Sequence, residues 1–220
     1  MEMKEKQLLI KEYRDLANSA TTTVGRIEYT ISADALEFPM SDIIANTIPL
    51  NYIREFRRTF LSNFYIADVV YQGVTFPSSE HAYQSAKFDT DVFTRLSKEQ
   101  FEEINAELAT RGHGVRIDAS SYPFSNYSFT SGNIKIIADF LREYGLVRTD
   151  WPDIKMDIMI DLLIQKFKHP FLQKLLDETK GKILVEGNTW KDTFWGYDSE
   201  EERGSNFLGR AIMEIRKLGE

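Results

Sequence analysis

A short helical pattern carries three polar side chains that could act together in catalysis. The segment FPSSEHAYQSAKF begins at Phe76 and carries Glu80, Gln84 and Lys87 at positions i, i+4 and i+7. At this spacing the three side chains share one face of a helix. An acid, an amide and an amine on one stripe are costly on a core-facing surface and ordinary on a solvated one. A solvated polar face is the simplest interpretation of this helix taken alone, and a catalytic group is the alternative.

A second segment, residues 184–196 (LVEGNTWKDTFWG), crowds aromatic and acidic side chains together. Asp192 and Trp195 lie three residues apart, so one turn could present both to a cavity. Aromatic faces beside a carboxylate suit a nucleobase or a sugar. In the alternative interpretation Trp190 and Trp195 are core anchors of a small domain, and for Trp190 the core is the position we expect.

Two further segments give weaker signals. Residues 204–209 (GSNFLG) directly precede a helical pattern, and their glycines could let the backbone approach an anion such as phosphate. The spacing is neither that of a Walker motif nor that of a Rossmann motif. In FLSNFY, residues 60–65, three aromatic side chains frame Ser62 and Asn63, as in a turn or in the floor of a polar pocket. The three histidines have no partners at ligand spacing, so we expect no metal site.

The composition limits what these residues can do. The chain has 220 residues, 27 basic against 34 acidic side chains, a net charge of −7 and no cysteine. Disulfides, thiolate nucleophiles and cysteine zinc sites are therefore excluded. No apolar run approaches the roughly 18 residues of a membrane helix, and the charged start lacks a signal peptide. We expect a cytoplasmic protein without a membrane partner, and the negative charge argues against coating a duplex.

The elements that must position these residues are mostly helical. We expect helices over about residues 1–20, 79–88, 91–110, 150–169, 170–179 and 206–218. Alternation predicts a strand at 27–32, and ILVE predicts a short strand at 183–186. Two β-rich triplets predict a hairpin over 69–76 that turns at Gln72-Gly73. A long loop over 112–131 precedes a short apolar segment at 134–141. The fold class is mainly α with a few short β-strands (α+β), because the strands are too few for a doubly wound sheet.

The order of these blocks resembles the NADAR family, the YbiA-like N-glycosidases. The matching features are FLSNFY, the block from Gly73 through Pro77 and Glu80 to Lys87-Phe88, Asp150-Trp151 before a Met-rich helix ending in Lys166-Phe167, LVEGNTWKDTFWG, and Gly204 to Gly209 with Met213 and Arg216. The resemblance implies a compact catalytic domain over residues 52–220 with an insertion at about 112–147. Residues 1–51 would then form an N-terminal extension of a helix and a strand.

The resemblance also implies hydrolysis of an N-glycosidic bond to ribose without a cofactor. The first substrate it indicates is ADP-ribose on a modified guanine in nucleic acid. A phosphorylated ribosylamino-pyrimidine intermediate of riboflavin synthesis is an alternative, and a non-catalytic module that binds NAD or ADP-ribose is another. The expected partners are a small nucleotide or an ADP-ribosylated base, with single-stranded or modified nucleic acid as an option, and the chain would be a monomer or a small homo-oligomer.

Cleavage of the C1′–N bond explains the residue types. Positive charge builds at C1′, and a carboxylate such as Glu80 or Asp192 could stabilise it and orient water. With a depressed pKa, Lys87 could instead attack the opened sugar aldehyde and form a Schiff base. The resemblance implies Glu80, Lys87 and Asp192 as catalytic residues. The implied substrate-binding residues are Ser62, Asn63, Gln84, Arg111, Trp151, Trp195, Gly196, Gly204 and Asn206, with Arg111 suited to phosphate.

The loop at 112–131 offers a candidate contact surface for a single strand. It carries four aromatic residues, Tyr122, Phe124, Tyr127 and Phe129, next to the basic residues Arg111, His113 and Arg116. Stacking and basic groups together are typical of single-strand binding. The alternative is an ordinary surface insertion that is packed by its own aromatic side chains.

Overall fold

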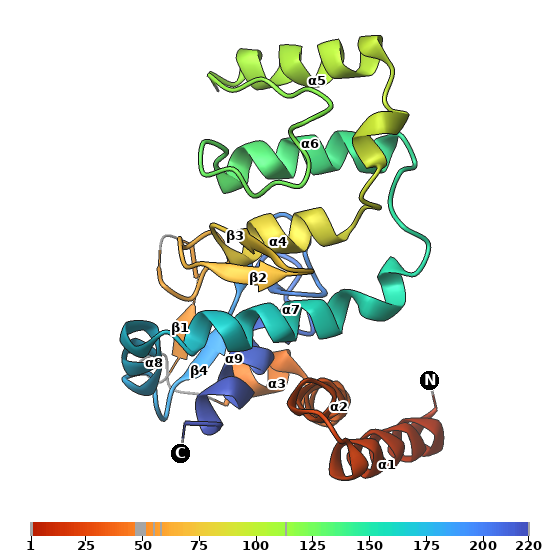
Figure 1. Ribbon diagram of the computed structural model, residues 1–220. Helices are drawn as coiled ribbons and strands as arrows, with labels where there is room; N and C mark the ends of the chain where they lie inside the picture. The colour runs from red at the N-terminus through yellow and green to blue at the C-terminus, as the bar shows by residue number, and fades with distance from the viewer. Residues whose placement is uncertain (1, 47–51, 55, 58, 113, 220) are drawn as a thin grey trace. The chain divides into compact units, whose positions relative to one another are not determined.

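The computed structural model describes residues 2–46, 52–54, 56–57, 59–112 and 114–219. The chain forms two compact units, one of Met1–Ser62 with Phe167–Glu220 and the other of Asn63–Lys166. Both units are mostly helical with a few short strands (Figure 1), which confirms the mainly α (α+β) class. Within the described residues no helix is long and apolar enough to cross a membrane.

The first unit begins with two helices that pack on each other, α1 (Met3–Ser19) and α2 (Thr23–Glu37). Arg14 of α1 pairs with Asp34 of α2 at 2.6 Å. The predicted strand at 27–32 is wrong, because these residues belong to α2. Thr22 caps this helix by accepting the Gly25 N–H at 3.0 Å, and the buried Ile27 and Ile31 lie four residues apart on one face. The helical period outweighs the short alternation.

The rest of the first unit places short strands beside its C-terminal helix. It contains α3 (Met40–Ala45), β1 (Tyr52–Arg54), α8 (Pro170–Asp177), β4 (Ile183–Val185), β5 (Gly187–Asn188), β6 (Tyr197–Asp198) and α9 (Phe207–Lys217). β1 pairs in parallel with β4, and β5 in parallel with β6. α9 packs against β4 and α2. β4, α8 and α9 confirm the strand predicted at 183–186 and the helices predicted at 170–179 and 206–218.

The second unit is built around a hairpin and the helix that follows it. β2 (Val69–Tyr71) and β3 (Val74–Phe76) pair antiparallel, and Gln72 and Gly73 turn with φ of 49° and 77°, as the Gln-Gly pair predicted. α4 (Ser79–Ala86) starts directly afterwards. α7 (Trp151–Phe167) lies against the hairpin, since the Gln165 amide bonds the N–H and C=O of Val70 at 2.8 and 3.0 Å.

Two more helices complete this unit. The helical pattern predicted from 91 divides into a short 3₁₀ turn (Val92–Arg95) and α5 (Lys98–Thr110). The apolar segment predicted at 134–141 is the centre of a full helix, α6 (Ser131–Glu143), whose start is fixed by a reciprocal cap between Thr130 and Asn133. α6 packs against both α5 and α4 and lies between them (Figure 1).

The aromatic residues of the 112–131 loop mostly face inward. Phe124 and Phe129 are buried in the core of α5 and α6, and the Tyr122 hydroxyl donates to the Ser85 and Phe88 carbonyls at 2.7 and 3.1 Å. Tyr127 is 60% exposed. The structure therefore favours an insertion packed by its own aromatic side chains over a stacking surface, and His113 lies outside the described residues.

Candidate active site

The helix α4 is the frame of the first candidate site. Its N-terminus is fixed by the Ser78 hydroxyl, which accepts the His81 N–H at 3.4 Å, and by the Asn63 carbonyl, which accepts the Glu80 N–H at 3.1 Å. Every residue of the helix is buried. Its polar side chains therefore do not form a solvated face, and the simplest interpretation of the sequence pattern is wrong.

Glu80 and Gln84 meet on this helix. The Gln84 Nε2 donates to Glu80 Oε1 at 2.7 Å, and the two residues are 7% and 6% exposed. The Gln84 Oε1 is buried without a hydrogen-bond partner among the described residues, and so is the Asn63 Oδ1. A buried acceptor of this kind costs about 1–3 kcal/mol, so its presence beside a carboxylate suggests a place where a ligand donor binds.

Burial shifts the acid and the amine of the site in opposite directions. It raises the pKa of Glu80, against the opposing effects of the Gln84 hydrogen bond and the Lys87 charge. It lowers the pKa of Lys87, against the opposing charges of Glu80 and Asp139. Glu80 therefore keeps its proton to higher pH than an exposed acid, and Lys87 loses its proton at lower pH than an exposed amine.

Two aromatic rings flank the Lys87 amine. The Lys87 Nζ lies 5.3 Å from the centroid of the Tyr83 ring and 6.0 Å from that of Trp151. The structure thus brings Trp151, a residue predicted for the site, to the same amine. Tyr83 was missed by sequence reasoning, although its position four residues before Lys87 on a helix is the signal that places it there.

His81 and Arg111 have separate roles in this unit. His81 is fully buried, with Nδ1 2.7 Å from the Ser78 hydroxyl and Nε2 2.8 Å from the Phe129 carbonyl, and is a packed histidine. Arg111 follows α5, where it pairs with Glu107 at 2.6 Å and is 59% exposed. Because α6 lies between α5 and α4 (Figure 1), the structure does not join Arg111 to the Glu80 cluster.

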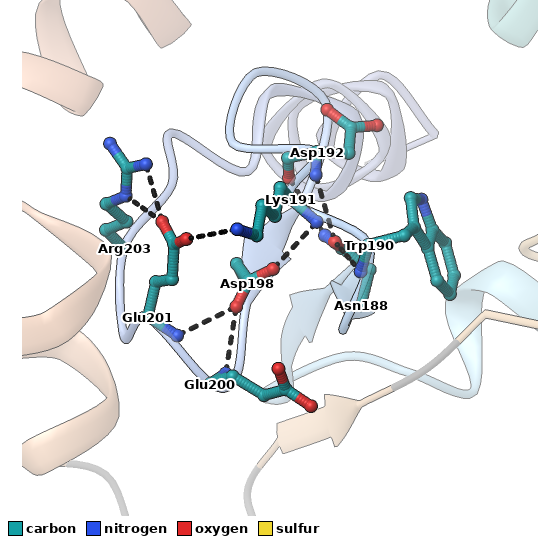
Figure 2. Close-up of polar contacts among 8 residues, drawn as sticks. All are labelled: Asn188, Trp190, Lys191, Asp192, Asp198, Glu200, Glu201 and Arg203. Atoms are coloured by element: carbon teal, nitrogen blue, oxygen red, sulfur yellow. Dashed lines mark hydrogen bonds and ion pairs between the residues drawn. The ribbon is translucent and has the colours of Figure 1, made fainter.

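Most of the other predicted site residues belong to the first unit, on the stretch between β5 and α9 that contains β6. Figure 2 shows that this stretch folds around Asp198, which accepts the N–H groups of Lys191, Glu200 and Glu201 at 2.8, 2.9 and 2.8 Å. These hydrogen bonds lower the pKa of Asp198. Glu201 in turn pairs with Lys191 at 3.4 Å and with Arg203. Sequence reasoning missed Asp198, because nothing in the residue types distinguishes it from its acidic neighbours.

Asp192 forms the turn that its spacing predicted. Its Oδ1 accepts the N–H groups of Phe194 and Trp195 at 3.1 and 2.9 Å, and the half-buried Trp195 ring meets Phe194 edge-on at 4.9 Å. Trp190 is 56% exposed, so its predicted place in the core is wrong. The Trp190 backbone N–H donates to Asn188 Oδ1 at 3.2 Å. This tight turn leaves the ring pointing outward (Figure 2).

The glycines and Asn206 bring the chain close to itself. A Cβ at Gly196 would lie 2.5 Å from the Glu186 carbonyl oxygen, and a Cβ at Gly204 would overlap the Gly196 carbonyl. The fully buried Asn206 amide accepts the Glu186 N–H and donates to the Leu184 carbonyl, each at 2.9 Å. At both glycines the neighbouring atoms are those of the chain itself. A contact of these residues with substrate stays a prediction. Ser62 lies in the same unit, in a turn closed by its N–H and the Thr59 carbonyl at 3.2 Å.

These two sites lie in a chain whose family can be identified. The family model for the NADAR domain matches residues 52–218, and the chain belongs to the NADAR family, as its motifs predicted. It is 32% identical over 161 residues to a riboflavin biosynthesis protein of Vibrio vulnificus (strain YJ016), over 72% of this chain and 35% of that protein. It is 44% identical to the chloroplastic riboflavin biosynthesis protein PYRR of Zea mays, over 64% of this chain and 19% of that one.

Smaller relatives match over more of their own length. The chain is 27% identical to the N-glycosidase YbiA of Escherichia coli (strain K12), over 71% of this chain and 78% of that protein. The NMR structure of Escherichia coli YbiA matches with a TM-score of 0.51 and 25% identity, over 78% of this chain and 86% of that one. The fold is therefore YbiA-like. By contrast, the chain spans only about a third or less of the two riboflavin relatives.

Proposed function

We propose that this chain is an N-glycosidase that cleaves the bond between a base nitrogen and C1′ of ribose. One observation carries the proposal: α4 buries the Glu80 carboxylate against the Gln84 amide at 2.7 Å, and the Lys87 amine follows directly at the end of the helix between two aromatic rings. Burial raises the pKa of this acid and lowers the pKa of this amine. Opposed shifts of this kind are typical of catalytic acid–base groups. The similarity to the N-glycosidase YbiA supports the same reaction class.

Glu80 can serve both halves of a direct hydrolysis. In its protonated form it donates a proton to the departing base nitrogen. The carboxylate that remains stabilises the positive charge on C1′ and orients the attacking water. The hydroxyl of that water bonds to C1′ and its second proton returns to Glu80, so one water is consumed and no electron is exchanged.

Lys87 offers a covalent route to the same products. When the ribose ring opens, the base N–H proton passes to O4′ and C1′ forms a double bond to the base nitrogen. The neutral amine then adds to C1′, and the base leaves as a free amine with both protons of the Lys87 amine. A Schiff base then joins Nζ to C1′. Water adds to C1′ and releases both the free sugar and the amine, so the overall balance is again one water consumed.

Two substrates share the bond that this site would break. We place ADP-ribose on a modified guanine first, as the family resemblance implies. The ribosylamino-pyrimidine intermediate of riboflavin synthesis is the second, favoured by the names of the Vibrio and Zea relatives. In both, ribose hydroxyls are donors for the buried acceptor oxygens of Gln84 and Asn63.

The test is a parallel assay of both substrates. We expect the chain to release a free base or sugar product from guanine-ADP-ribosylated DNA or from the riboflavin intermediate. Glu80→Gln and Lys87→Ala should each lower the rate at least about a hundredfold. Glu102→Gln and Lys98→Ala are matched controls, because these residues form an exposed acid–amine pair at 3.7 Å on α5. Their rates should equal that of the parent.

A borohydride experiment separates the two routes. If Lys87 forms the Schiff base, reduction during turnover should fix the sugar to the peptide that contains Lys87, and Lys87→Ala should prevent this. Turnover without a fixed sugar would leave direct hydrolysis by Glu80. Tight binding of ADP-ribose with no product from either substrate would contradict the enzyme and support a non-catalytic binding module.

A further inference from the structure

The two rings beside Lys87 come from different elements and touch each other. Tyr83 lies one turn before Lys87 on α4, and Trp151 is the first residue of α7. Their centroids are 4.9 Å apart, with 59° between the ring planes. Both rings lie within about 6 Å of the amine, the range in which an aromatic face attracts a cation. The Lys87 amine therefore lies beside a small aromatic cage.

The same segment that supplies Trp151 also holds the backbone of Lys87. The Arg148 N–H donates to the Lys87 carbonyl at 2.9 Å, and the Trp151 N–H donates to the Arg148 carbonyl at 3.2 Å. Arg148 is fixed by a two-pronged pair with Asp150, at 2.5 and 2.8 Å. One short turn thus positions both the main chain and the side chain of Lys87. The ring of Tyr83, which is 5% exposed, is the second aromatic contact of the amine.

We propose that Tyr83, braced by Trp151, is a positioning residue that orients the Lys87 amine toward the sugar. A carboxylate in this place would pair with the amine and hold it protonated. A ring face attracts the ammonium more weakly and does not occupy the nitrogen lone pair once the proton leaves. The cage therefore orients the amine in its charged state without blocking its attack.

Other charged groups also act on this amine. The charge of Glu80 acts on it from α4, and those of Lys135, Asp139 and Arg142 act on it from α6. Asp139 and Arg142 pair with each other at 3.0 Å, as Arg148 and Asp150 do on the turn before α7. A test of the cage must leave these groups in place, which substitutions at Tyr83 do.

The inference rests on the proposed function for its effect on turnover, and a chemical readout tests it separately. An amine-reactive reagent applied over a range of pH gives the midpoint at which Lys87 becomes reactive, measured on its peptide by mass spectrometry. Tyr83→Phe keeps the ring. Phenylalanines with increasing fluorine at this position keep its shape while weakening the attraction of its face for a cation.

We expect the Lys87 midpoint to fall stepwise with fluorination, by about half a pH unit or more in total. In the enzyme assay, Tyr83→Leu should lower kcat at least tenfold at an unchanged KM, and Tyr83→Phe should restore it. Tyr144→Leu is the control, because Tyr144 is a partly buried aromatic residue that packs against the core of α5 and α6, and it should leave the midpoint in place.

A midpoint that does not move with fluorination would overturn the cage, whatever the enzyme does. Unchanged kcat in Tyr83→Leu, in an enzyme that turns over, would overturn the positioning role alone. If the parent shows no turnover, the proposed function fails, and the labelling profile still decides whether the ring acts on the amine.

Discussion

Two carboxylates of this chain, each buried, are treated in opposite ways. Asp198 accepts three backbone N–H groups, and these lower its pKa. Glu80 has one amide partner, and burial raises its pKa. The first carboxylate is held in its charged form by its own loop. The second is kept in surroundings that favour its neutral form, and the oxygen of its Gln84 partner has no hydrogen-bond partner among the described residues.

The difference separates a polar cluster that stabilises its own loop from one that we propose for catalysis. A carboxylate with all its donors supplied by backbone stabilises the fold and has little left to offer a substrate. A carboxylate that is poorly solvated costs stability but keeps its proton to higher pH than an exposed acid, as an acid catalyst requires. Substitutions in the first cluster should therefore change stability, and substitutions in the second should change activity.

The largest effect on stability is expected at Gly209 in the first unit, where the backbone leaves no room for a Cβ. A Cβ at Gly209 would overlap the Leu184 carbonyl oxygen, which is backbone, and would crowd the Asn206 amide. Gly209→Ala should lower the free energy of unfolding by about 3 kcal/mol, measured by urea denaturation. Gly132→Ala is the control, because its Cβ would lie 3.6 Å from Thr130 Oγ1. Equal stabilities of the two variants would contradict this packing.

A smaller, pH-dependent effect is expected at Asp198. Because its pKa is lower in the folded state, its contribution to stability is present above the unfolded value of about 3.9 and is lost as the pH falls through the folded value. Asp198→Asn should be less stable than the parent at neutral pH, and the gap should narrow in acid. Glu200→Gln, an exposed neighbour, should show no such gap. A gap that is constant with pH would show that charge is not what Asp198 contributes.

Sequence reasoning predicted the parts of this molecule that are encoded locally. The Gln72-Gly73 turn, the helix start at residue 79 and the start of α7 next to Asp150 depend on a few adjacent residues, and the structure has all three. The ordered motifs also identified the family. By contrast, the strand expected at 27–32 is part of a helix. A six-residue alternation does not reveal that Ile27 and Ile31 face the same core.

The sequence indicated which residues to consider for the candidate site, but it did not indicate the surroundings of their side chains. The spacing of Glu80, Gln84 and Lys87 predicted a shared helix face, but it could not show that this face is buried and not solvated. Tyr83 was missed because an aromatic residue in a helix usually means core. Trp190 was misplaced for the same reason, since composition alone does not show that its turn leaves the ring exposed. Whether a side chain is buried depends on segments that are distant in the sequence, and the residue pattern of one segment does not show which segments pack on it.

The smallest expected change in stability tests how much the buried Glu80 carboxylate lowers the free energy of unfolding. Its pKa is raised on folding, so its contribution to stability is present below the unfolded value of about 4.3 and is lost as the pH rises through the folded value. Glu80→Gln removes that cost, and the amide oxygen of the introduced glutamine can still accept the Gln84 N–H. The variant should gain of the order of 1 kcal/mol in free energy of unfolding at neutral pH and nothing in acid, while losing activity. Glu102→Gln, an exposed acid on α5, should gain nothing at either pH. A Glu80→Gln variant that is less stable than the parent at neutral pH would mean that this carboxylate, like Asp198, builds structure, and the contrast between the two clusters would fail.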